Sequence, residues 1–473
     1  MKSTGPLAVH AIGRSGTARD LDLPLAFDLK SGRKMSAQEK HDTHHKALSI
    51  NLDGTIFGSF AEIGAGQEVA RWFLRVGGAS GTVAKTISAY DKEVSDQLYG
   101  AGTRYVSKPR LKAMLGIEWE QLLGQLAASR GADTKFFSFV DTVSARNYAG
   151  TNDCHGWVGL RFLVGAGQTP NDVILHVNLR DPSNLRQQEA MGILGVNLIY
   201  AAHYALGSPE EFLASIDEDL GLHRLEIDCV ELHGQAFVSW DSDRLQALLV
   251  AGGYAEAVVF PADDQFVPPN ELLYKRALVL APGRFDNVDQ LHAHLIRDTQ
   301  AQLPQEELKE SKGALGLFCL STSRTRAENT QMSVQEIVEH VSNLKRLGYG
   351  VMIFRARELY KMSEYANRYT KLRIHFAIGL SVLVRVFEDS YRDLSGTLLE
   401  GVARLFAQNV RLSVYPVASA DLERLTRGLS GWSWDEKNGV VSAEDVRPPK
   451  PLDSLYQYLL GTRFILPGKS LRS

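Results

Sequence analysis

Seven residues in the C-terminal part of the chain are of the types that proteins use to hold a phosphate or carboxylate group. They form two short clusters and are Ser321, Thr322, Ser323, Arg324, Arg326, Arg355 and Arg357. A guanidinium can donate two parallel hydrogen bonds to one anion, and hydroxyls and backbone amides at a helix start add further donors. These residue types therefore predict a site for a small anionic ligand.

The two clusters can meet only if the strands that precede them are neighbours. Each cluster follows a nearly continuous apolar run, which is typical of a strand buried on both faces of a sheet. We expect strands at 314–320, 349–355, 373–379 and 410–417, alternating with helices at 333–347, 358–369, 381–391 and 397–407. Connections of that length predict parallel strands, whose ligands bind beyond the carboxyl ends. Residues 313–420 are thus predicted to form a parallel, doubly wound-like β-α-β-α-β-α-β unit. The alternative is that these arginines lie on the surface and pair with Glu328, Glu336 and Glu358.

A glycine turn near the N-terminus is a second candidate for phosphate binding. Gly64 and Gly66 follow a predicted strand at 57–63 and precede a predicted helix at 67–76. Glycines at such a position let backbone amides approach a pyrophosphate. Val69 stands where a dinucleotide-binding fingerprint has its third glycine. The alternative is a tight turn that packs the helix against the strand.

A second glycine cluster follows the same predicted helix. It contains Gly77, Gly78 and Gly81 and leads to Lys85. Glycines, hydroxyls and a lysine can form a phosphate cradle, although the lysine does not directly follow the last glycine as it does in a P-loop. Asp91 and Asp96 lie downstream and could hold a metal ion. The alternative is a flexible loop that ends the helix.

Cysteine chemistry is not indicated by the sequence. Cys154, Cys229 and Cys319 are far apart and no CxxC occurs, which favours a reducing compartment. The pair Cys154-His155 could suggest a nucleophile with its base. Adjacent residues of an extended chain point in opposite directions, so we expect turn chemistry there instead.

The rest of the chain predicts a second α/β domain and two terminal extensions. We expect a polar extension at 1–47, a mixed α/β domain at 48–301, a linker at 302–313 and a docking tail at 431–473. Within the first domain, apolar runs at 136–144, 157–164 and 172–179 are joined by short connections and predict an antiparallel meander. Trp432 and Trp434 in the tail would suit a subunit interface.

Composition excludes several classes of protein. The 473 residues carry 52 Lys and Arg against 55 Asp and Glu, a formal net charge of −3, so no nucleic-acid partner is expected. The longest apolar run, 191–207, contains three glycines and is interrupted by Asn197 and His203, so it predicts a buried helix rather than a membrane span. No secretory signal precedes the domain, and a cytoplasmic location without a membrane partner is expected.

Three segments, 52–71, 84–91 and 153–157, resemble a family of uncharacterised bacterial cytosolic proteins whose members are often named nicotinate-nucleotide adenylyltransferase. The likeness spans residues 47–417. It implies a nucleotide-binding transferase, which would use a glycine-rich strand end before an H-x-G-H motif and a Ser-Ser-Thr loop leading to an arginine. Gly54-Thr55 is similar to the first element, and the loop 320–326 is similar to the second. No H-x-G-H occurs in the chain, so no catalytic residue is assigned.

The sequence therefore favours a cytosolic α/β enzyme that binds a nucleotide or phosphometabolite. Transfer of a nucleotidyl group is implied by the resemblance alone. Mg²⁺ would accompany a nucleotide-dependent reaction. The alternative is a non-enzymatic, self-assembling or scaffold protein whose glycine loops and tail make subunit contacts. Both hypotheses include a homo-oligomer.

Overall fold

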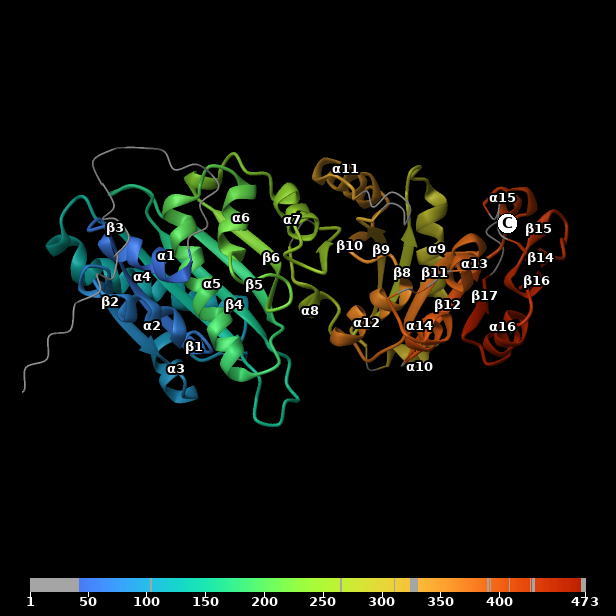
Figure 1. Cartoon of the computed structure of the whole chain (residues 1–473), viewed down its shortest axis with the longest axis horizontal. Helices are drawn as coiled ribbons and strands as arrows, with labels where there is room; N and C mark the ends of the chain where they lie inside the picture. The colour runs from blue at the N-terminus through green and yellow to red at the C-terminus, as the bar shows by residue number, and fades with distance from the viewer. Residues whose placement is uncertain are drawn as a thin grey trace, which may run out of the picture. The chain divides into compact units, whose positions relative to one another are not determined.

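The computed structural model of the chain describes residues 42–468, with gaps at 103, 264–265, 310, 324–330, 389–390, 392, 408, 426 and 428–429. Two open sheets with helices on their faces make it an α/β protein, as predicted (Figure 1). The predicted ligand residues Arg324 and Arg326, and residues 1–41 of the predicted extension, lie outside the described residues.

The first sheet has six strands in the order β2-β1-β3-β4-β5-β6. Its strands are β1 (Ile56–Gly64), β2 (Val83–Ser88), β3 (Lys135–Ser144), β4 (His155–Phe162), β5 (Asn171–Leu179) and β6 (Leu225–His233). Strands β2, β1 and β3 are parallel, and β3 to β6 form an antiparallel run. The predicted meander is confirmed by these pairings.

Helices cover both faces of the first sheet. They are α1 (Thr43–Leu52), α2 (Gln67–Val76), α3 (Lys92–Tyr99), α4 (Lys108–Arg130), α5 (Asn184–Tyr204), α6 (Pro209–Asp217) and α7 (Ser242–Ala251). One face packs on α1, α2 and α5 through residues such as Phe60 and Phe73. The other packs on α4 through Leu111, Val140 and Trp157. The apolar run at 191–207 lies mostly within α5 and is buried, as predicted.

The second sheet has seven strands in the order β17-β12-β11-β8-β9-β10-β7. Its strands are β7 (Ala257–Phe260), β8 (Ala277–Gly283), β9 (Ala314–Ser321), β10 (Gly350–Phe354), β11 (Ile374–Gly379), β12 (Val410–Tyr415) and β17 (Ile465–Pro467). All are parallel except β7, which pairs antiparallel with β10 at one edge. The predicted parallel unit is confirmed for β9 to β12.

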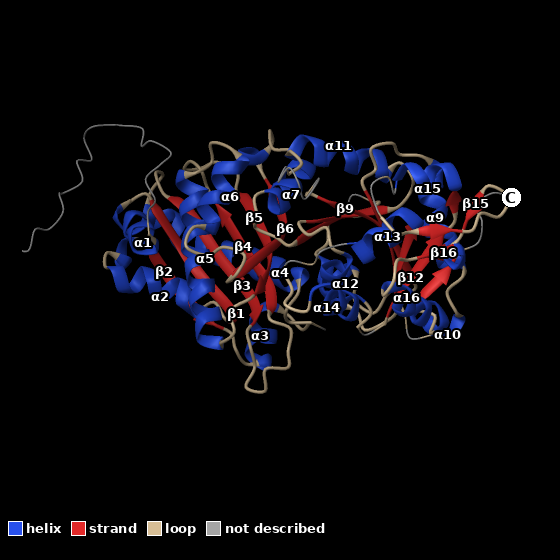
Figure 2. Ribbon diagram, turned by 45° about the vertical axis from the view of Figure 1, so that its right-hand side comes forward, coloured by secondary structure: helices blue, strands red, loops and turns tan. Residues whose placement is uncertain are grey.

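Both faces of the second sheet are covered by helices (Figure 2). The helices of this region are α8 (Pro269–Leu272), α9 (Gln290–Ala301), α10 (Gln305–Leu308), α11 (Val334–Lys345), α12 (Leu359–Tyr369), α13 (Leu380–Glu388), α14 (Thr397–Leu405), α15 (Ser419–Leu425) and α16 (Leu452–Gly461). Phe318 packs on the side of α9 and α11, whereas Leu317 and Cys319 pack on the side of α12 and α13. Continuous apolar strands follow from this double burial.

The second sheet includes a strand that the sequence analysis did not predict. Strand β8 lies between β9 and β11, so the predicted linker at 302–313 falls inside this sheet, between two of its central strands. The apolar run of β8 is only five residues long and ends in Pro282 and Gly283, which favour a turn on local chemistry alone. Pairing on both sides of β8 overrides that local preference.

The ends of the chain also differ in detail from the prediction. Helix α1 begins at Thr43, inside the predicted extension, because Asp42 accepts a hydrogen bond from the His45 amide (2.8 Å) and caps the helix. The tail adds β17 to the second sheet. Two short ribbons also form, β13 (Val417–Ala418) with β15 (Val440–Val441) and β14 (Ser433–Trp434) with β16 (Val446–Arg447). Trp432 and Trp434 pack partly buried against the core of their own chain.

Candidate functional site

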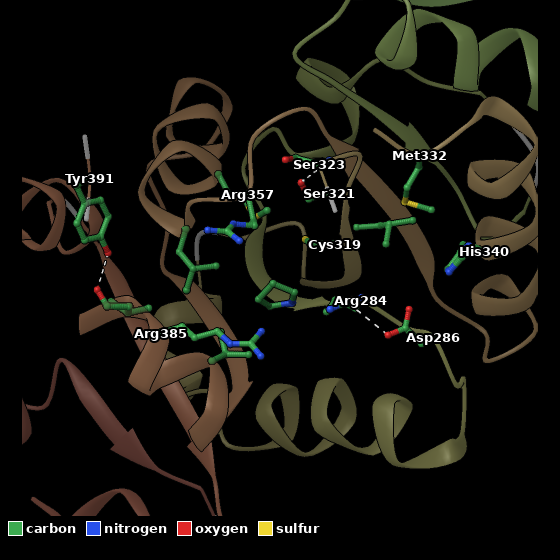
Figure 3. A pocket seen from close by; sticks show the side chains of 17 residues that line it. Arg284, Asp286, Cys319, Ser321, Ser323, Met332, His340, Arg357, Arg385 and Tyr391 are labelled. Carbon is green, nitrogen blue, oxygen red and sulfur yellow. Dashed lines mark hydrogen bonds and ion pairs between the residues drawn. The ribbon is translucent and has the colours of Figure 1, made fainter. Parts of the chain in front are cut away.

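A pocket of about 460 Å³ opens at the carboxyl ends of the central strands of the second sheet (Figure 3). Pro282 and Gly283 at the end of β8 and Cys319, Leu320 and Ser321 at the end of β9 form its floor. The volume lies within the range of small-molecule sites in proteins. After β8 the chain adds β9 and β10 on one side of that strand, and it later adds β11 and β12 on the other side. Ligands of open α/β sheets bind where the strand order reverses in this way.

Cationic side chains dominate the pocket. Arg284 follows β8, Arg357 follows β10 and Arg385 lies on α13. The carboxylate that lines the pocket with them is Asp286, whose Oδ2 lies 3.4 Å from Arg284 Nε; both side chains are mostly exposed. Among the described lining residues, three guanidiniums and one carboxylate give a net positive charge, which favours an anionic ligand.

Hydroxyl groups and one imidazole supply further polar contacts. Ser321 Oγ accepts a hydrogen bond from the Ser323 amide (3.2 Å), and both residues line the pocket. His340 comes from α11, and its Nδ1 lies 2.7 Å from the Glu336 carbonyl oxygen. A carbonyl only accepts, so Nδ1 donates and the neutral ring keeps Nε2 as an acceptor. Burial raises the pKa of the Cys319 thiol, which excludes a ready thiolate nucleophile at this floor.

The remaining wall of the pocket is apolar. It contains Met332, Leu359, Met362, Val382, Val386 and Tyr391. In Figure 3, Arg357 and Arg385 lie on one side of the pocket, and Met332 and His340 lie on the other. A ligand that satisfies both walls has an anionic group and an apolar or aromatic body.

The structure brings three of the seven predicted anion ligands to this pocket and separates two others. Ser321, Ser323 and Arg357 line it. Thr322 is buried, and its amide donates to the Phe354 carbonyl (2.8 Å). The guanidinium of Arg355 lies beside Gly253, and Arg355 does not line the pocket.

Four lining residues with charged or imidazole side chains were missed by sequence reasoning. Arg284 and Asp286 follow the unpredicted strand β8, and His340 and Arg385 lie on helices. A signal existed only for the first two, since a buried parallel strand at 277–281 would have placed the following residues at the same edge. Helical side chains become neighbours of that edge only through tertiary packing.

The second predicted phosphate cradle lies on the first sheet and does not line this pocket. The Asn51 amide donates to the Gly77 carbonyl (2.6 Å), and Lys85 Nζ lies 2.8 Å from Glu118 Oε2. Gly78 precedes a short 3₁₀ turn between α2 and β2, and Gly81 is the last residue of that turn. The downstream carboxylates are also engaged, since Asp91 caps α3 and Asp96 pairs with Arg110. The local contacts favour the interpretation of this segment as a loop that ends a helix.

Close packing explains why the turn after β1 contains glycines. Gly64 has φ +104°, a conformation that side-chain-bearing residues rarely adopt, and a β-carbon there would overlap the Val143 carbonyl of β3. At Gly66, a β-carbon would overlap the carboxyl group of Asp141. The turn therefore needs both glycines for close packing, whether or not a ligand binds it.

Replacement of Gly64 by alanine is expected to cost about 2–3 kcal/mol of stability, since backbone strain and the overlap with Val143 add together. Gly77→Ala is the matched control. Gly77 also has positive φ (+91°) but has no atom near its β-carbon position, so only about 1 kcal/mol is expected. Urea unfolding of the two variants measures the difference. Equal losses would show that the contact with β3 contributes nothing.

The first sheet contains a buried polar relay that the sequence analysis did not find. His155 Nδ1 lies 3.1 Å from His176 Nε2, and His176 Nδ1 lies 2.6 Å from Asp228 Oδ1. Asn178 Nδ2 also donates to Asp228, at 2.7 Å. Burial lowers the pKa of His155 to about 4. His155 is thus engaged with residues of β5 and β6 rather than with Cys154, as expected for adjacent residues of a strand.

No group of three or more His, Cys, Asp or Glu is placed to hold a metal ion within the described part of the chain. The three cysteines are free. None of the described helices combines the length and the apolar character needed to cross a membrane.

Neither a family model nor a curated protein sequence matches the chain. Solved structures with some likeness include the competence/damage inducible protein CihA from Agrobacterium tumefaciens, 20% identical with a TM-score of 0.25, over 34% of this chain and 96% of that one. A competence or damage-inducible protein from Enterobacter asburiae is 12% identical with a TM-score of 0.25, over 34% of this chain and 99% of that one. At these TM-scores the likeness carries no conclusion. Fold and pocket define the class instead: an α/β protein with a cationic pocket at the carboxyl edge of its parallel sheet.

Proposed function

We propose that this protein binds a nucleotide or another phosphorylated metabolite in the pocket of the second sheet. The observation that carries the proposal is the convergence of Arg284, Arg357 and Arg385 on one cavity at the carboxyl ends of parallel strands. Phosphate oxygens match the paired donors of guanidinium groups, and a phosphate ester brings the anionic charge that the lining favours.

The apolar wall supports an ester rather than inorganic phosphate. Met332, Leu359 and Val382 offer no polar atoms to a second charged group. A base, a nicotinamide-type ring or an acyl chain would bury its surface there, while the phosphate faces the arginines. The pocket volume of about 460 Å³ lies in the range of small-molecule sites and is compatible with a mononucleotide.

Transfer of a nucleotidyl group is the reaction that we propose for this pocket, since the resemblance implies it. His340 lines the pocket and offers Nε2 as an acceptor, because its Nδ1 donates to the Glu336 carbonyl oxygen. Mg²⁺ would then accompany the nucleotide phosphates. Binding and transfer are separate parts of this proposal. A panel of ligands tests binding alone.

Thermal shift and calorimetry with a panel of nucleotides, nicotinamide compounds and phosphorylated metabolites, each with and without Mg²⁺, test the binding. Arg357→Ala is expected to weaken the best ligand about tenfold or more, because a charged hydrogen bond to phosphate is lost. Arg355→Ala is the matched control, since this arginine stands two residues away and does not line the pocket. A panel without any ligand for the wild type, or equal affinities in wild type and Arg357→Ala, would overturn the proposal.

A further inference from the structure

Two carboxyl groups face each other across neighbouring parallel strands of the first sheet. Glu62 of β1 is in register with Asp141 of β3, so both side chains leave the same face of the sheet. The two residues are 5% and 0% exposed. They lie near the carboxyl ends of β1 and β3, below the turn that contains Gly66, and the carboxyl group of Asp141 lies against that glycine.

The two carboxyl groups are unequally satisfied. The side chains of Ser88 and Gln67 and the Gly66 amide interact with the Glu62 carboxyl group and partly offset the rise in its pKa that burial causes. Glu62 Oε2 and both oxygens of Asp141 have no hydrogen-bond partner among the described residues, although all three atoms are buried. Buried carboxyl oxygens are almost always paired, so these three atoms are suited to bind a proton or a cation.

No cationic side chain of the described residues compensates this charge. Neither Glu62 nor Asp141 takes part in an ion pair within the described chain, and the charged group that acts on Asp141 is Glu62 itself. Burial together with that repulsion raises the pKa of Asp141 well above its usual value. Two adjacent carboxylates in such a place need either a proton or a bound cation.

A single shared proton satisfies too few atoms. It would join one oxygen of Asp141 to Glu62 Oε2 and would leave the second oxygen of Asp141 without a partner. A divalent cation can take all three oxygens as ligands, and hard cations such as Mg²⁺ are commonly held by one or two carboxylates with water or phosphate oxygens completing the shell.

We propose that Glu62 and Asp141 form a binding site for a hard divalent cation of the Mg²⁺ or Mn²⁺ type. Glu62 would contribute Oε2 and Asp141 both of its oxygens. Ser88, exposed at the end of β2, and Gln67, at the start of α2, lie beside Glu62 on its way to solvent and give an ion a polar entry. This site is independent of the phosphate pocket in the second sheet, and either proposal can fail alone.

Mn²⁺ titration followed by electron paramagnetic resonance tests the site, because the six-line signal of free Mn²⁺ disappears on binding. The full-length wild type is expected to take up about one equivalent at micromolar to low millimolar Mn²⁺, in competition with Mg²⁺. Asp141→Asn and Glu62→Gln are each expected to weaken uptake at least tenfold. Asp172→Asn is the matched control, since Asp172 lies in the same sheet but pairs with Arg161.

The outcomes separate the cation from a shared proton. Circular dichroism first establishes that each variant is folded; Glu62→Gln, which changes the less buried carboxyl group, tests the site if Asp141→Asn does not fold. A wild type that leaves the Mn²⁺ signal unchanged up to millimolar concentration would overturn the proposal in favour of a shared proton. If Asp141→Asn and Glu62→Gln take up Mn²⁺ as the wild type does, the ion lies at another site and the proposal is overturned.

Discussion

Replacement of Asp228 by alanine is expected to lower the free energy of unfolding by about 3–5 kcal/mol, the largest effect of any single substitution considered. Asp228 accepts hydrogen bonds from His176 Nδ1 (2.6 Å) and Asn178 Nδ2 (2.7 Å). All three side chains are buried. Without the carboxylate, two donors remain in the interior with no acceptor, and each unpaired group costs its full desolvation energy.

The measurement is equilibrium unfolding in urea, with Asp172→Ala as the control. Asp172 also pairs with a cationic group on the same sheet, Arg161 at 2.7 Å, but the pair is partly exposed. Its loss is expected to cost about 1 kcal/mol or less. Similar losses in the two variants would show that the relay around His176 contributes little beyond an ordinary ion pair.

The relay also shows what a single sequence can and cannot predict. The apolar runs at 157–164 and 172–179 predicted β4 and β5, and their short connection predicted that they are antiparallel neighbours. Register was not predictable from this, and one residue of slip would send His155 and His176 to the opposite face. Asp228 is harder still, because it lies at an irregularity in the pairing of β5 with β6, where the spacing of partners shifts.

The pocket was predictable in outline for a different reason. Ser321 and Arg357 follow two strands that local patterns identify, and parallel topology alone brings their carboxyl ends to one edge. Arg284 depends on β8, whose short apolar run is recognisable only from its partners on both sides. The separation of Arg355 from Arg357 was not predictable, because residues two apart share a face of a continuing strand, whereas β10 ends at Phe354, before both arginines.

Glu62 and Asp141 gave no sequence signal at all. They lie 79 positions apart in the chain and carry no motif, and each alone resembles an ordinary polar residue of a strand. Parallel pairing of β1 with β3 makes them neighbours, and the overlying glycine turn buries them. The same turn attracted a phosphate-binding prediction, although two buried carboxyl groups beneath it would oppose an anion unless a cation lies between.

In the presence of a chelator, the protein is expected to lose stability as the pH rises from about 4.5 to 7. Burial raises the pKa of Glu62 to about 7. An acid whose pKa is higher in the folded state binds its proton more tightly there, so its contribution to stability is complete below the unfolded pKa and is lost as the pH rises through the folded one. The shift of Glu62 corresponds to about 3 kcal/mol, and Asp141 acts in the same direction.

The double variant Glu62→Gln/Asp141→Asn isolates this effect from the other titrating groups. The difference in unfolding free energy between wild type and double variant, measured in urea with EDTA at several pH values, is expected to fall by about 3 kcal/mol or more across this window. Mn²⁺ added at pH 8 is then expected to restore stability to the wild type and not to the double variant, because a cation replaces the missing proton. A pH-independent difference would contradict the raised pKa of Glu62 and would show that the two carboxyl groups ionise in the folded protein without mutual cost.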